Sequence, residues 1–329
     1  MKPKILHLLG DDKMGGVKST VENLKNSRLA EQFEFSTSPI ETARAAISNL
    51  KPDLILCHQA CNWKGLVDLL LVRLLHRRTK IVIYEHHYSA GFERFNVPSV
   101  ARFRLMLKLS HALAHRVVAI SQAQQKWLNA NNLVAQKKLD LIQPCCNLDN
   151  FLQLSPKPSN QLLTLATYGR FCTQKGFDIL LDAMRLIPQA PIRLRIAGTG
   201  PDEAKLKKAA QGLDNVQFVG RIDDVAQFLQ SCDAVIVPSR WEPWGIVCLE
   251  AKAASKALIV ADVDGLSEQI QDCGLAVPSL DSQELAQAIA SLLSQNLEAW
   301  GEAGRKSVKH AWEKYLEQWE NLFWRVIGF

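Results

Sequence analysis

The sequence predicts an α/β protein made of two Rossmann-like, parallel-sheet domains that face a central cleft. Short apolar runs rich in β-branched residues and leucine alternate with longer stretches of helical period, which is typical of strands buried on both faces by helices. The chain has 329 residues, more than one hydrophobic core usually covers. A segment rich in proline, serine and asparagine near the middle indicates a linker.

The first half contains four candidate strands, and helical segments such as WKGLVDLLLVRLLHRR separate them. The strands are KILHLL (4–9), DLILCH (53–58), KIVIYE (80–85) and RVVAIS (116–121). Because strand and helix alternate, we expect a parallel sheet.

The second half repeats this scheme with five candidate strands. They are LLTLATYG (162–169), IRLRIAG (192–198), NVQFVG (215–220), DAVIVPS (233–239) and ALIVAD (257–262). The linker CCNLDNFLQLSPKPSNQ places the domain boundary near residue 155, so the predicted domains are 1–155 and 156–305. In such sheets ligands bind where loops leave the carboxyl ends of the strands.

Composition excludes several classes of protein. The net charge of +6 is mild, and the chain has no long basic tract and no basic patch interleaved with aromatic residues, which argues against nucleic acid as a partner. Eight cysteines without paired CxxC spacing suggest reduced, mostly buried thiols and no metal site. The N-terminal apolar run is too short and too polar for a signal peptide or a spanning helix, so we expect a cytoplasmic protein.

The stretch PSRWEPWGIVCLEA (238–251) follows a predicted strand and holds two glutamates, Glu242 and Glu250. A helix that starts at Trp244 and Gly245 would present backbone N–H groups, that of Ile246 included, to a phosphate. Glu250 would lie about 7 Å along the helix axis, at a rise of roughly 1.5 Å per residue. That separation suits a ligand with hydroxyl groups on both sides of a pyrophosphate, and a nucleotide sugar is such a ligand.

The spacing Glu242-x7-Glu250 within EPWGIVCLEA closely resembles the E-x7-E motif of the retaining glycosyltransferases of family 4, which have the GT-B fold. Further motifs follow in the order of that family: GG at 15–16, GRFCTQKG at 169–176, IAGTGP at 196–201 and FVGR at 218–221. The resemblance covers nearly the whole chain. It implies a metal-independent, retaining transfer of sugar from a UDP- or GDP-sugar to an acceptor hydroxyl in cell-surface polysaccharide or glycolipid synthesis, with no cofactor besides that donor.

The resemblance also implies roles for individual residues. Arg170 and Lys175 would bind the diphosphate, Glu250 would accept hydrogen bonds from the ribose hydroxyls, and Glu242 would hold hydroxyls of the transferred sugar. His86, at the end of KIVIYE, is the candidate for the histidine beside the donor sugar, and the adjacent His87 is its rival.

Further positions would complete the donor site, by the same resemblance. The backbone around Gly15 and Gly16 would close on the phosphates, and the loop at Gly220 and Arg221 would border the base. Turns at two other glycines also belong to the donor site: Gly198 and Gly200. The chain departs from the family pattern at Lys18, where a glutamate is usual, and at Asp264, where a glycine is usual.

Alternative interpretations exist for most of these residues. Glu242 can simply cap the helix that follows it, Glu250 can be an exposed helical carboxylate, and the glycines can serve only as turns. A dinucleotide-binding oxidoreductase is disfavoured because no GxGxxG follows the first strand. A non-catalytic relative that binds a nucleotide or glycan remains the second alternative.

Two helical segments bear on possible partners. SVARFRLMLKLSHALAHR (99–116) carries basic residues among leucines and can either contact anionic lipid or pack as a helix with a solvated basic edge. The C-terminal helix (306–329) carries aromatic residues at steps of three and four, which indicates a buried face. In the resembling family this helix packs back on the N-terminal domain. A glycan or a lipid-linked molecule is the expected acceptor.

Overall fold

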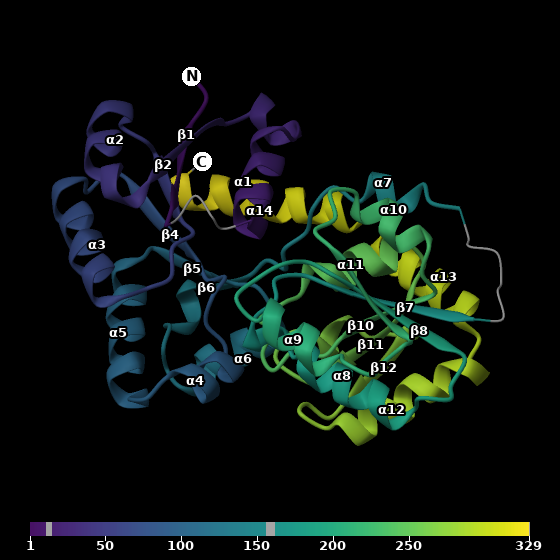
Figure 1. Cartoon of the computed structure of the whole chain (residues 1–329). Helices are drawn as coiled ribbons and strands as arrows, with labels where there is room; N and C mark the ends of the chain where they lie inside the picture. The colour runs from purple at the N-terminus through teal and green to yellow at the C-terminus, as the bar shows by residue number, and fades with distance from the viewer. Residues whose placement is uncertain (11–14, 156–161, 329) are drawn as a thin grey trace. The chain divides into compact units, whose positions relative to one another are not determined.

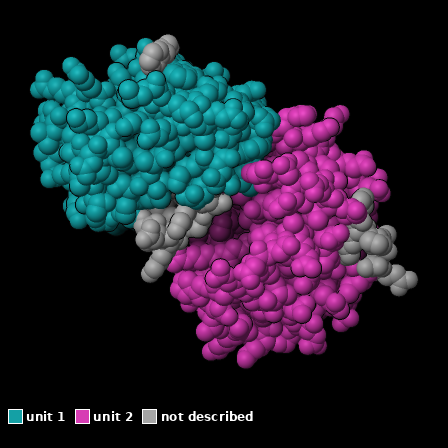
Figure 2. Space-filling model, turned by 90° about the horizontal axis from the view of Figure 1, so that it is seen from above, with its two compact units in different colours: residues 1–146, 312–329 teal, residues 147–311 magenta. Residues whose placement is uncertain are grey.

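The computed structural model describes residues 1–10, 15–155 and 162–328, and it divides the chain into two compact units (Figure 2). Unit 1 comprises Met1–Cys146 and Trp312–Phe329, and unit 2 comprises Asn147–Ala311. The unit boundaries therefore fall at 146 and 311, whereas the sequence suggested 155 and 305. The proline-rich part of the expected linker, residues 156–161, lies outside the described residues.

Unit 1 is built on a six-stranded parallel sheet with the order β2-β1-β3-β4-β5-β6 (Figure 1). Its strands are β1 (Lys4–Leu9), β2 (Glu34–Pro39), β3 (Leu54–Cys57), β4 (Lys80–Tyr84), β5 (Arg116–Ala119) and β6 (Leu139–Leu141). Its helices are α1 (Gly15–Lys25), α2 (Ala43–Leu50), α3 (Trp63–Leu75), α4 (Ala90–Asn96), α5 (Val100–Leu113), α6 (Gln122–Ala130) and α14 (Ala311–Ile327).

Unit 2 has a second six-stranded parallel sheet, with the order β12-β11-β10-β7-β8-β9. Its strands are β7 (Leu163–Tyr168), β8 (Ile192–Ala197), β9 (Val216–Gly220), β10 (Ala234–Val237), β11 (Ala257–Ala261) and β12 (Gly274–Val277). Its helices are α7 (Asp149–Leu152), α8 (Phe177–Leu186), α9 (Glu203–Ala209), α10 (Val225–Gln230), α11 (Ile246–Ala253), α12 (Ser282–Ser291) and α13 (Leu297–Val308).

The predicted fold class is confirmed, since all nine predicted strands are present. Three further strands escaped the sequence pattern for identifiable reasons. β2 has the polar sequence EFSTSP at a sheet edge, β6 has three residues, and β12 is a four-residue edge strand that begins with glycine. Edge strands bury less side-chain surface and therefore need no continuous apolar run.

Strand order fixes where each sheet can bind a ligand. In unit 2 the order reverses between β7 and β10, and ligands of such sheets bind beside the loops that leave the carboxyl ends of the strands at this reversal. In unit 1 the corresponding reversal lies between β1 and β3. These two points are where functional side chains are expected.

The aromatic face of α14 is buried in unit 1. Trp319 and Phe323 are fully buried, Trp319 packs edge-on against Tyr84 of β4, and Phe323 packs against Phe33. An ion pair joins Glu320 to Arg28 at 2.5 Å. The C-terminal helix is therefore part of the core of unit 1 (Figure 1, yellow).

No helix among the described residues is both long enough and apolar enough to cross a membrane.

Candidate functional site

The charged side chains of unit 2 gather at the point where its strand order reverses. Lys175 belongs to the turn after β7, and Glu242 belongs to the loop after β10. The ammonium group of Lys175 donates to the carboxylate Oε2 of Glu242, which also accepts a hydrogen bond from Ser239 at 3.4 Å. The structure thus brings together two residues that lie 67 positions apart in the sequence.

The ion pair keeps Lys175 charged. Burial lowers the pKa of Lys175, but the neighbouring carboxylate of Glu242 outweighs burial, so that the pKa lies above its ordinary value. Because an ammonium group has three donors, Lys175 can hold Glu242 and still donate to an anion. Both hydrogen bonds of the carboxylate are to Oε2, so Oε1 of Glu242, which has no hydrogen bond to another described residue, can accept from a hydroxyl group of a ligand.

The backbone of Glu242 is held by the loop after β11. The amide of Glu242 donates to Asp264 Oδ2 at 3.1 Å, and the carbonyl of Glu242 accepts from the amide of Gly265 at 3.3 Å. Asp264 has a φ of 43°, in the left-handed region that favours glycine and that aspartate tolerates. This backbone conformation gives a physical reason for a glycine at this position, and the side chain of Asp264 adds a contact that glycine lacks.

Sequence reasoning missed the residues that support the turn of Lys175. Arg240 donates two hydrogen bonds to the carboxylate of Asp178, at 2.8 and 2.7 Å, and a third to the carbonyl of Thr173 at 2.9 Å. Arg240 therefore ties the loop after β10 to the turn after β7. The sequence shows Arg240 next to the E-x7-E motif, but nothing in it reveals Asp178 as the partner.

Helix α11 begins at Ile246, so the expected start at Trp244 and Gly245 is early by one to two residues. Gly245 is the N-cap with a φ of 89°, and a Cβ there would lie 2.6 Å from Leu266. No side-chain hydrogen bond caps the helix at Gly245, and the carboxylate of Glu242 accepts instead from Lys175 and Ser239. The buried amide of Gln269, also missed from sequence, donates to the carbonyls of Trp244 and Gly245 and fixes the turn.

This helix start presents backbone N–H groups near the Lys175–Glu242 pair. The first turn of α11 contains no acidic residue. Uncapped amides at a helix N-terminus attract an anion such as a phosphate, because they carry the positive end of the helix dipole.

Glu250 lies one turn into α11 and is partly buried rather than exposed. Its Oε2 accepts a hydrogen bond of 2.6 Å from the hydroxyl of Tyr168, at the end of β7. Burial raises the pKa of Glu250 to about 7, although the hydrogen bond from Tyr168 works in the opposite direction. A carboxyl group in this state titrates near neutral pH.

The remaining predicted donor residues of unit 2 follow β7, β8 and β9. Arg170 is exposed and forms no ion pair with another described residue. A Cβ on Gly198 would lie 1.9 Å from the carbonyl oxygen of Gly169, and one on Gly200 would lie 2.3 Å from that of Phe171. Only glycine permits this close approach of the two loops. Arg221 is exposed and is 3.5 Å from Asp223.

In unit 1, three histidines form a buried chain that ends at His86. His7 Nδ1 is 2.9 Å from His58 Nε2, and His58 Nδ1 is 3.1 Å from His86 Nε2. Burial lowers the pKa of each histidine, that of His7 to about 3, so the chain is neutral. His58 was not predicted, although it follows β3 in DLILCH.

The hydrogen bonds that connect His7, His58 and His86 indicate which ring nitrogen of His86 carries the proton. His7 Nε2 is buried and has no partner among the described residues, and an unpaired lone pair there costs less than an unpaired N–H. His7 therefore donates to His58, and His58 donates to His86 Nε2. The proton of His86 is then on Nδ1. His87 differs, since its Nε2 is 3.1 Å from the carbonyl oxygen of His58.

Two predicted features lie at the start of α1. Helix α1 begins at Gly15, so Gly15 and Gly16 form its first turn. Residues 11–14, which precede this helix, lie outside the described residues.

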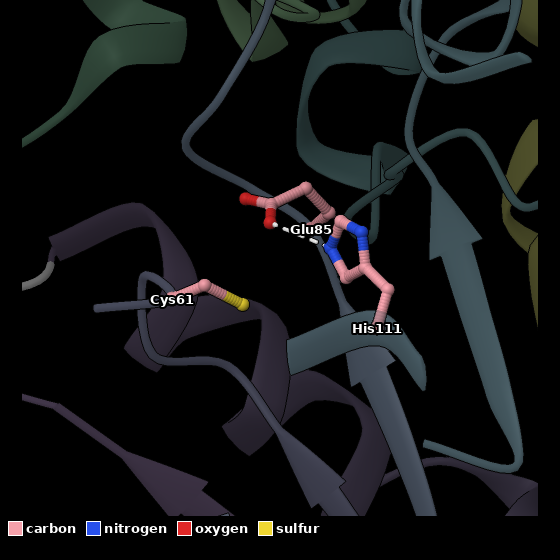
Figure 3. Close-up of side chains that lie close together, drawn as sticks. All are labelled: Cys61, Glu85 and His111. Carbon is pink, nitrogen blue, oxygen red and sulfur yellow. Dashed lines mark ion pairs between the residues drawn. The ribbon is translucent and has the colours of Figure 1, made fainter. Parts of the chain in front are cut away.

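Three side chains of unit 1 that are common metal ligands lie close together: Cys61, Glu85 and His111 (Figure 3). Their sulfur, oxygen and nitrogen atoms all lie within 4.8 Å of one another, and all three side chains are buried. These are the described residues that could hold a metal ion.

Comparisons with known proteins agree with the geometry. A family model described as Glycosyltransferase Family 4 matches residues 15–150, and one described as Glycosyl transferases group 1 matches residues 153–307. Over 164 residues the chain is 32% identical to a phosphatidyl-myo-inositol mannosyltransferase of Mycobacterium leprae, covering 47% of this chain and 43% of that protein. The chain thus spans less than half the length of the first curated relatives it matches.

Solved structures share the fold over almost the whole chain. The crystal structure of Anabaena Alr3699/HepE in complex with UDP and glucose has a TM-score of 0.79 and 19% identity, covering 98% of this chain and 99% of that one. Sucrose-phosphate synthase from Thermosynechococcus elongatus has a TM-score of 0.82 and 20% identity, with the same coverage. With two consecutive family models that reach from residue 15 to residue 307, the chain belongs to family 4 of the glycosyltransferases and has the GT-B fold.

Proposed function

We propose that the protein transfers a sugar from a nucleoside-diphosphate sugar to an acceptor hydroxyl with retention of configuration, in the synthesis of a cell-surface polysaccharide or glycolipid. The observation that carries this proposal is the Lys175–Glu242 ion pair beside the uncapped start of α11. A cation and free backbone amides suit a diphosphate, and a carboxylate with one available oxygen suits sugar hydroxyls.

The donor-binding roles follow from the contacts in unit 2. Lys175, Arg170 and the first amides of α11 neutralise the diphosphate, and Glu250 accepts hydrogen bonds from the ribose. Exposed Arg221 borders the base. UDP is the first nucleotide to test, because solved structures with this fold contain UDP or UDP-glucose.

The chemical step needs little acid catalysis because a nucleoside diphosphate is already a good leaving group. The acceptor oxygen forms a bond to C1 of the sugar on the face from which the diphosphate departs. The bond between C1 and the phosphate oxygen breaks, and the acceptor proton passes to that oxygen. Lys175 stabilises the charge that develops on the leaving phosphate, and a fixed cation of this kind is worth about 10²–10³ in rate. No metal ion is needed at the phosphates.

Of the two adjacent histidines, His86 is the better candidate to contact the donor sugar. The histidine chain leaves its Nδ1–H as the group that His86 can offer, which makes His86 a hydrogen-bond donor. His87 contributes its ring Nε2 to the carbonyl of His58 and its backbone amide to Glu85, so its contacts serve the loop.

A surface of unit 1 supports a lipid-linked acceptor and peripheral contact with the cytoplasmic face of a membrane. Helices α3 and α5 pack side by side (Figure 1). Both helices expose apolar side chains. Their N-terminal ends meet where Arg102 lies over the ring of Trp63, and their C-terminal ends meet where Arg73 contacts His115. The helices therefore run in the same direction. The exposed apolar residues on the two helices are Trp63, Val67, Leu70, Leu74, Leu75, Val100, Leu105 and Leu109.

The charge of this α3–α5 surface is complementary to anionic lipid. Exposed cations border the apolar residues: Lys64, Arg77, Arg78, Arg102 and Lys108. Asp68, the acidic residue of α3, forms an ion pair with Arg44 at 3.0 Å. Apolar side chains flanked by cations are typical of helices that lie in the membrane interface. Helix α5 has a buried face as well as this exposed one, since Met106 and Leu107 are buried in the core. The two interpretations of this helix from sequence therefore do not exclude each other.

Thermal unfolding with UDP, GDP, ADP and NAD, each added separately, tests the proposed donor site. A nucleotide at about 100 times its Kd stabilises the fold by about 2.7 kcal/mol. We expect a shift with one nucleoside diphosphate that is smaller in Lys175→Ala. Stabilisation by NAD alone would contradict the proposal and favour an oxidoreductase.

Release of that nucleoside diphosphate from its sugar conjugates, with and without added Mg²⁺, then tests turnover. We expect equal rates in both conditions. Nucleotide binding without turnover of any donor would favour a non-catalytic relative, and strict dependence on Mg²⁺ would contradict the metal-independent step.

A further inference from the structure

Three side chains from three different elements of unit 1 point to a common centre in its core (Figure 3). Cys61 lies in the connection between β3 and α3, Glu85 directly follows β4, and His111 lies in the last turn of α5. Their exposed fractions are 6%, 1% and 1%. Sulfur, carboxylate oxygen and imidazole nitrogen together form a ligand set that suits a borderline-soft divalent cation such as Zn²⁺.

The two atoms that face each other lack hydrogen-bond partners among the described residues. His111 Nε2 and Glu85 Oε2 are both buried and unsatisfied, and they are 3.7 Å apart. A buried polar atom without a partner is costly, so two such atoms aimed at one point call for an explanation. A separation of 3.7 Å is too long for a hydrogen bond between them.

The surrounding contacts orient both groups as they would be oriented for a metal. His111 Nδ1 is 3.1 Å from the carbonyl oxygen of Leu133, so it carries the proton and Nε2 carries a lone pair. The other carboxylate oxygen of Glu85 accepts from the amides of His87 and Tyr88, at 3.1 and 3.3 Å. Metal-bound histidine typically donates its second nitrogen to a carbonyl, and a metal-bound carboxylate is typically held by hydrogen bonds.

The spacing also fits a zinc ion. Ligand distances are about 2.0–2.2 Å for nitrogen and oxygen and about 2.3 Å for sulfur, so two nitrogen or oxygen ligands of one tetrahedral ion lie roughly 3.4 Å apart. The 3.7 Å between Glu85 and His111 is close to this value. A zinc-bound sulfur lies roughly 3.6 Å from the nitrogen and oxygen ligands of the same ion. The sulfur of Cys61 lies within 4.8 Å of both partners, so it reaches the same centre by moving toward them.

We propose that Cys61, Glu85 and His111 bind one structural Zn²⁺ in the core of unit 1, contrary to the expectation from sequence that the cysteines mark no metal site. The ion joins three segments that are remote in sequence. Because Glu85 also holds the amides of His87 and Tyr88, the ion fixes the turn that carries His86. The proposal concerns the stability of unit 1 and does not depend on the proposed transferase activity.

Metal content of the full-length protein tests this directly. After equilibration with Zn²⁺ and dialysis into metal-free buffer, we expect about one zinc per wild-type chain by mass spectrometry of the elements, because all three ligands are buried and exchange slowly with solvent. Cys61→Ser, Glu85→Gln and His111→Gln should each lose it. The matched control is Cys57→Ser, which replaces a cysteine that is equally buried on β3 but outside the cluster. Zinc retained equally by wild type and all three ligand variants would come from another site and would overturn the assignment.

The absorption spectrum of the cobalt-substituted protein gives a second measurement. Co²⁺ bound through a thiolate produces a near-ultraviolet charge-transfer band, which we expect in wild type and Cys57→Ser and not in Cys61→Ser. A wild-type protein with no retained zinc and no such band would overturn the proposal. The facing atoms would then be a buried imidazolium–carboxylate pair, recognised by nitrogen NMR of His111 with protons on both ring nitrogens.

Discussion

The two units of this protein carry different kinds of side chain at the carboxyl ends of similar parallel sheets. In unit 2 the site is charged, with Lys175 paired to Glu242 and Arg240 paired to Asp178. In unit 1 the equivalent edge carries neutral histidines, and His86 ends a buried hydrogen-bonded chain. The charges of unit 2 suit the diphosphate of the proposed donor, whereas the neutral groups of unit 1 suit hydrogen bonds to uncharged ligand groups.

Loss of the central cation should have the largest effect. Lys175→Ala removes the charge that stabilises the departing phosphate, so we expect kcat to fall by about 10²–10³. Removal of Lys175 also leaves the buried carboxylate of Glu242 without its ion-pair partner, which destabilises the fold. Steady-state kinetics with the identified donor measure the first effect, and thermal unfolding measures the second.

The control for this variant is Lys207→Ala on α9. Lys207 also pairs with a glutamate, Glu203, but in an exposed position. We expect its kcat and unfolding midpoint to match those of wild type, because exposed ion pairs contribute little. A Lys175→Ala enzyme with wild-type kcat would place the chemistry elsewhere.

In unit 1, the activity of variants of His86 should depend on where the replaced side chain places a hydrogen-bond donor, and not on its charge. If His86 donates through Nδ1, the side chain of His86→Asn places an amide N–H near that nitrogen, whereas His86→Gln places it near Nε2. We expect kcat to fall about 10²-fold in the glutamine variant and less in the asparagine variant. The opposite order, measured by the same kinetics, would contradict the tautomer assigned by the histidine chain.

The apolar surface of unit 1 sharpens the comparison further. Leu70→Gln combined with Leu74→Gln should weaken binding to vesicles of phosphatidylcholine and phosphatidylglycerol by about tenfold or more, because each exposed leucine loses favourable burial in the interface. The measurement is co-sedimentation. Leu186→Gln, an equally exposed leucine of unit 2, should bind as wild type does. If the double variant binds the vesicles as well as Leu186→Gln does, this surface does not contact lipid. If wild type binds vesicles of phosphatidylcholine alone as well as it binds the mixed vesicles, the cations of the surface do not recognise anionic lipid.

Sequence reasoning succeeded where a pattern is local. Nine strands follow from continuous apolar runs, and the E-x7-E spacing locates Glu242 and Glu250 on their loop and helix. It failed where partners are distant in sequence. No sequence pattern predicts that Arg240 binds Asp178 or that Cys61 lies near His111. The same is true of the hydrogen bonds by which His58 connects His7 with His86. These pairs arise because parallel strands bring the ends of remote segments together, and a single sequence carries no record of that proximity.

The smallest expected effect concerns the titration of Glu250, the one group of the charged site with a pKa raised to about 7. Above that pH the ionised carboxylate accepts two hydrogen bonds from a ribose, and below it the protonated form accepts fewer. We expect the affinity for the nucleoside diphosphate to rise several-fold between about pH 6 and about pH 8. Calorimetric titration measures this dependence. Glu250→Gln should bind the nucleotide more weakly, and its affinity should change less with pH. The pH dependence that remains in this variant comes from the nucleotide itself and is subtracted from that of wild type.

The same group has the opposite effect on the free protein. Its pKa is higher in the folded state than the ordinary value of 4.5, so the protonated form stabilises the fold. That contribution is fully present below about pH 4.5 and is lost as pH rises to about 7. The unfolding midpoint of Glu250→Gln should therefore rise relative to wild type across this interval and stay parallel above it. A constant difference between the two proteins would mean that Glu250 titrates normally, and the charged site of unit 2 would then hold an ionised glutamate at all pH values above about 4.5.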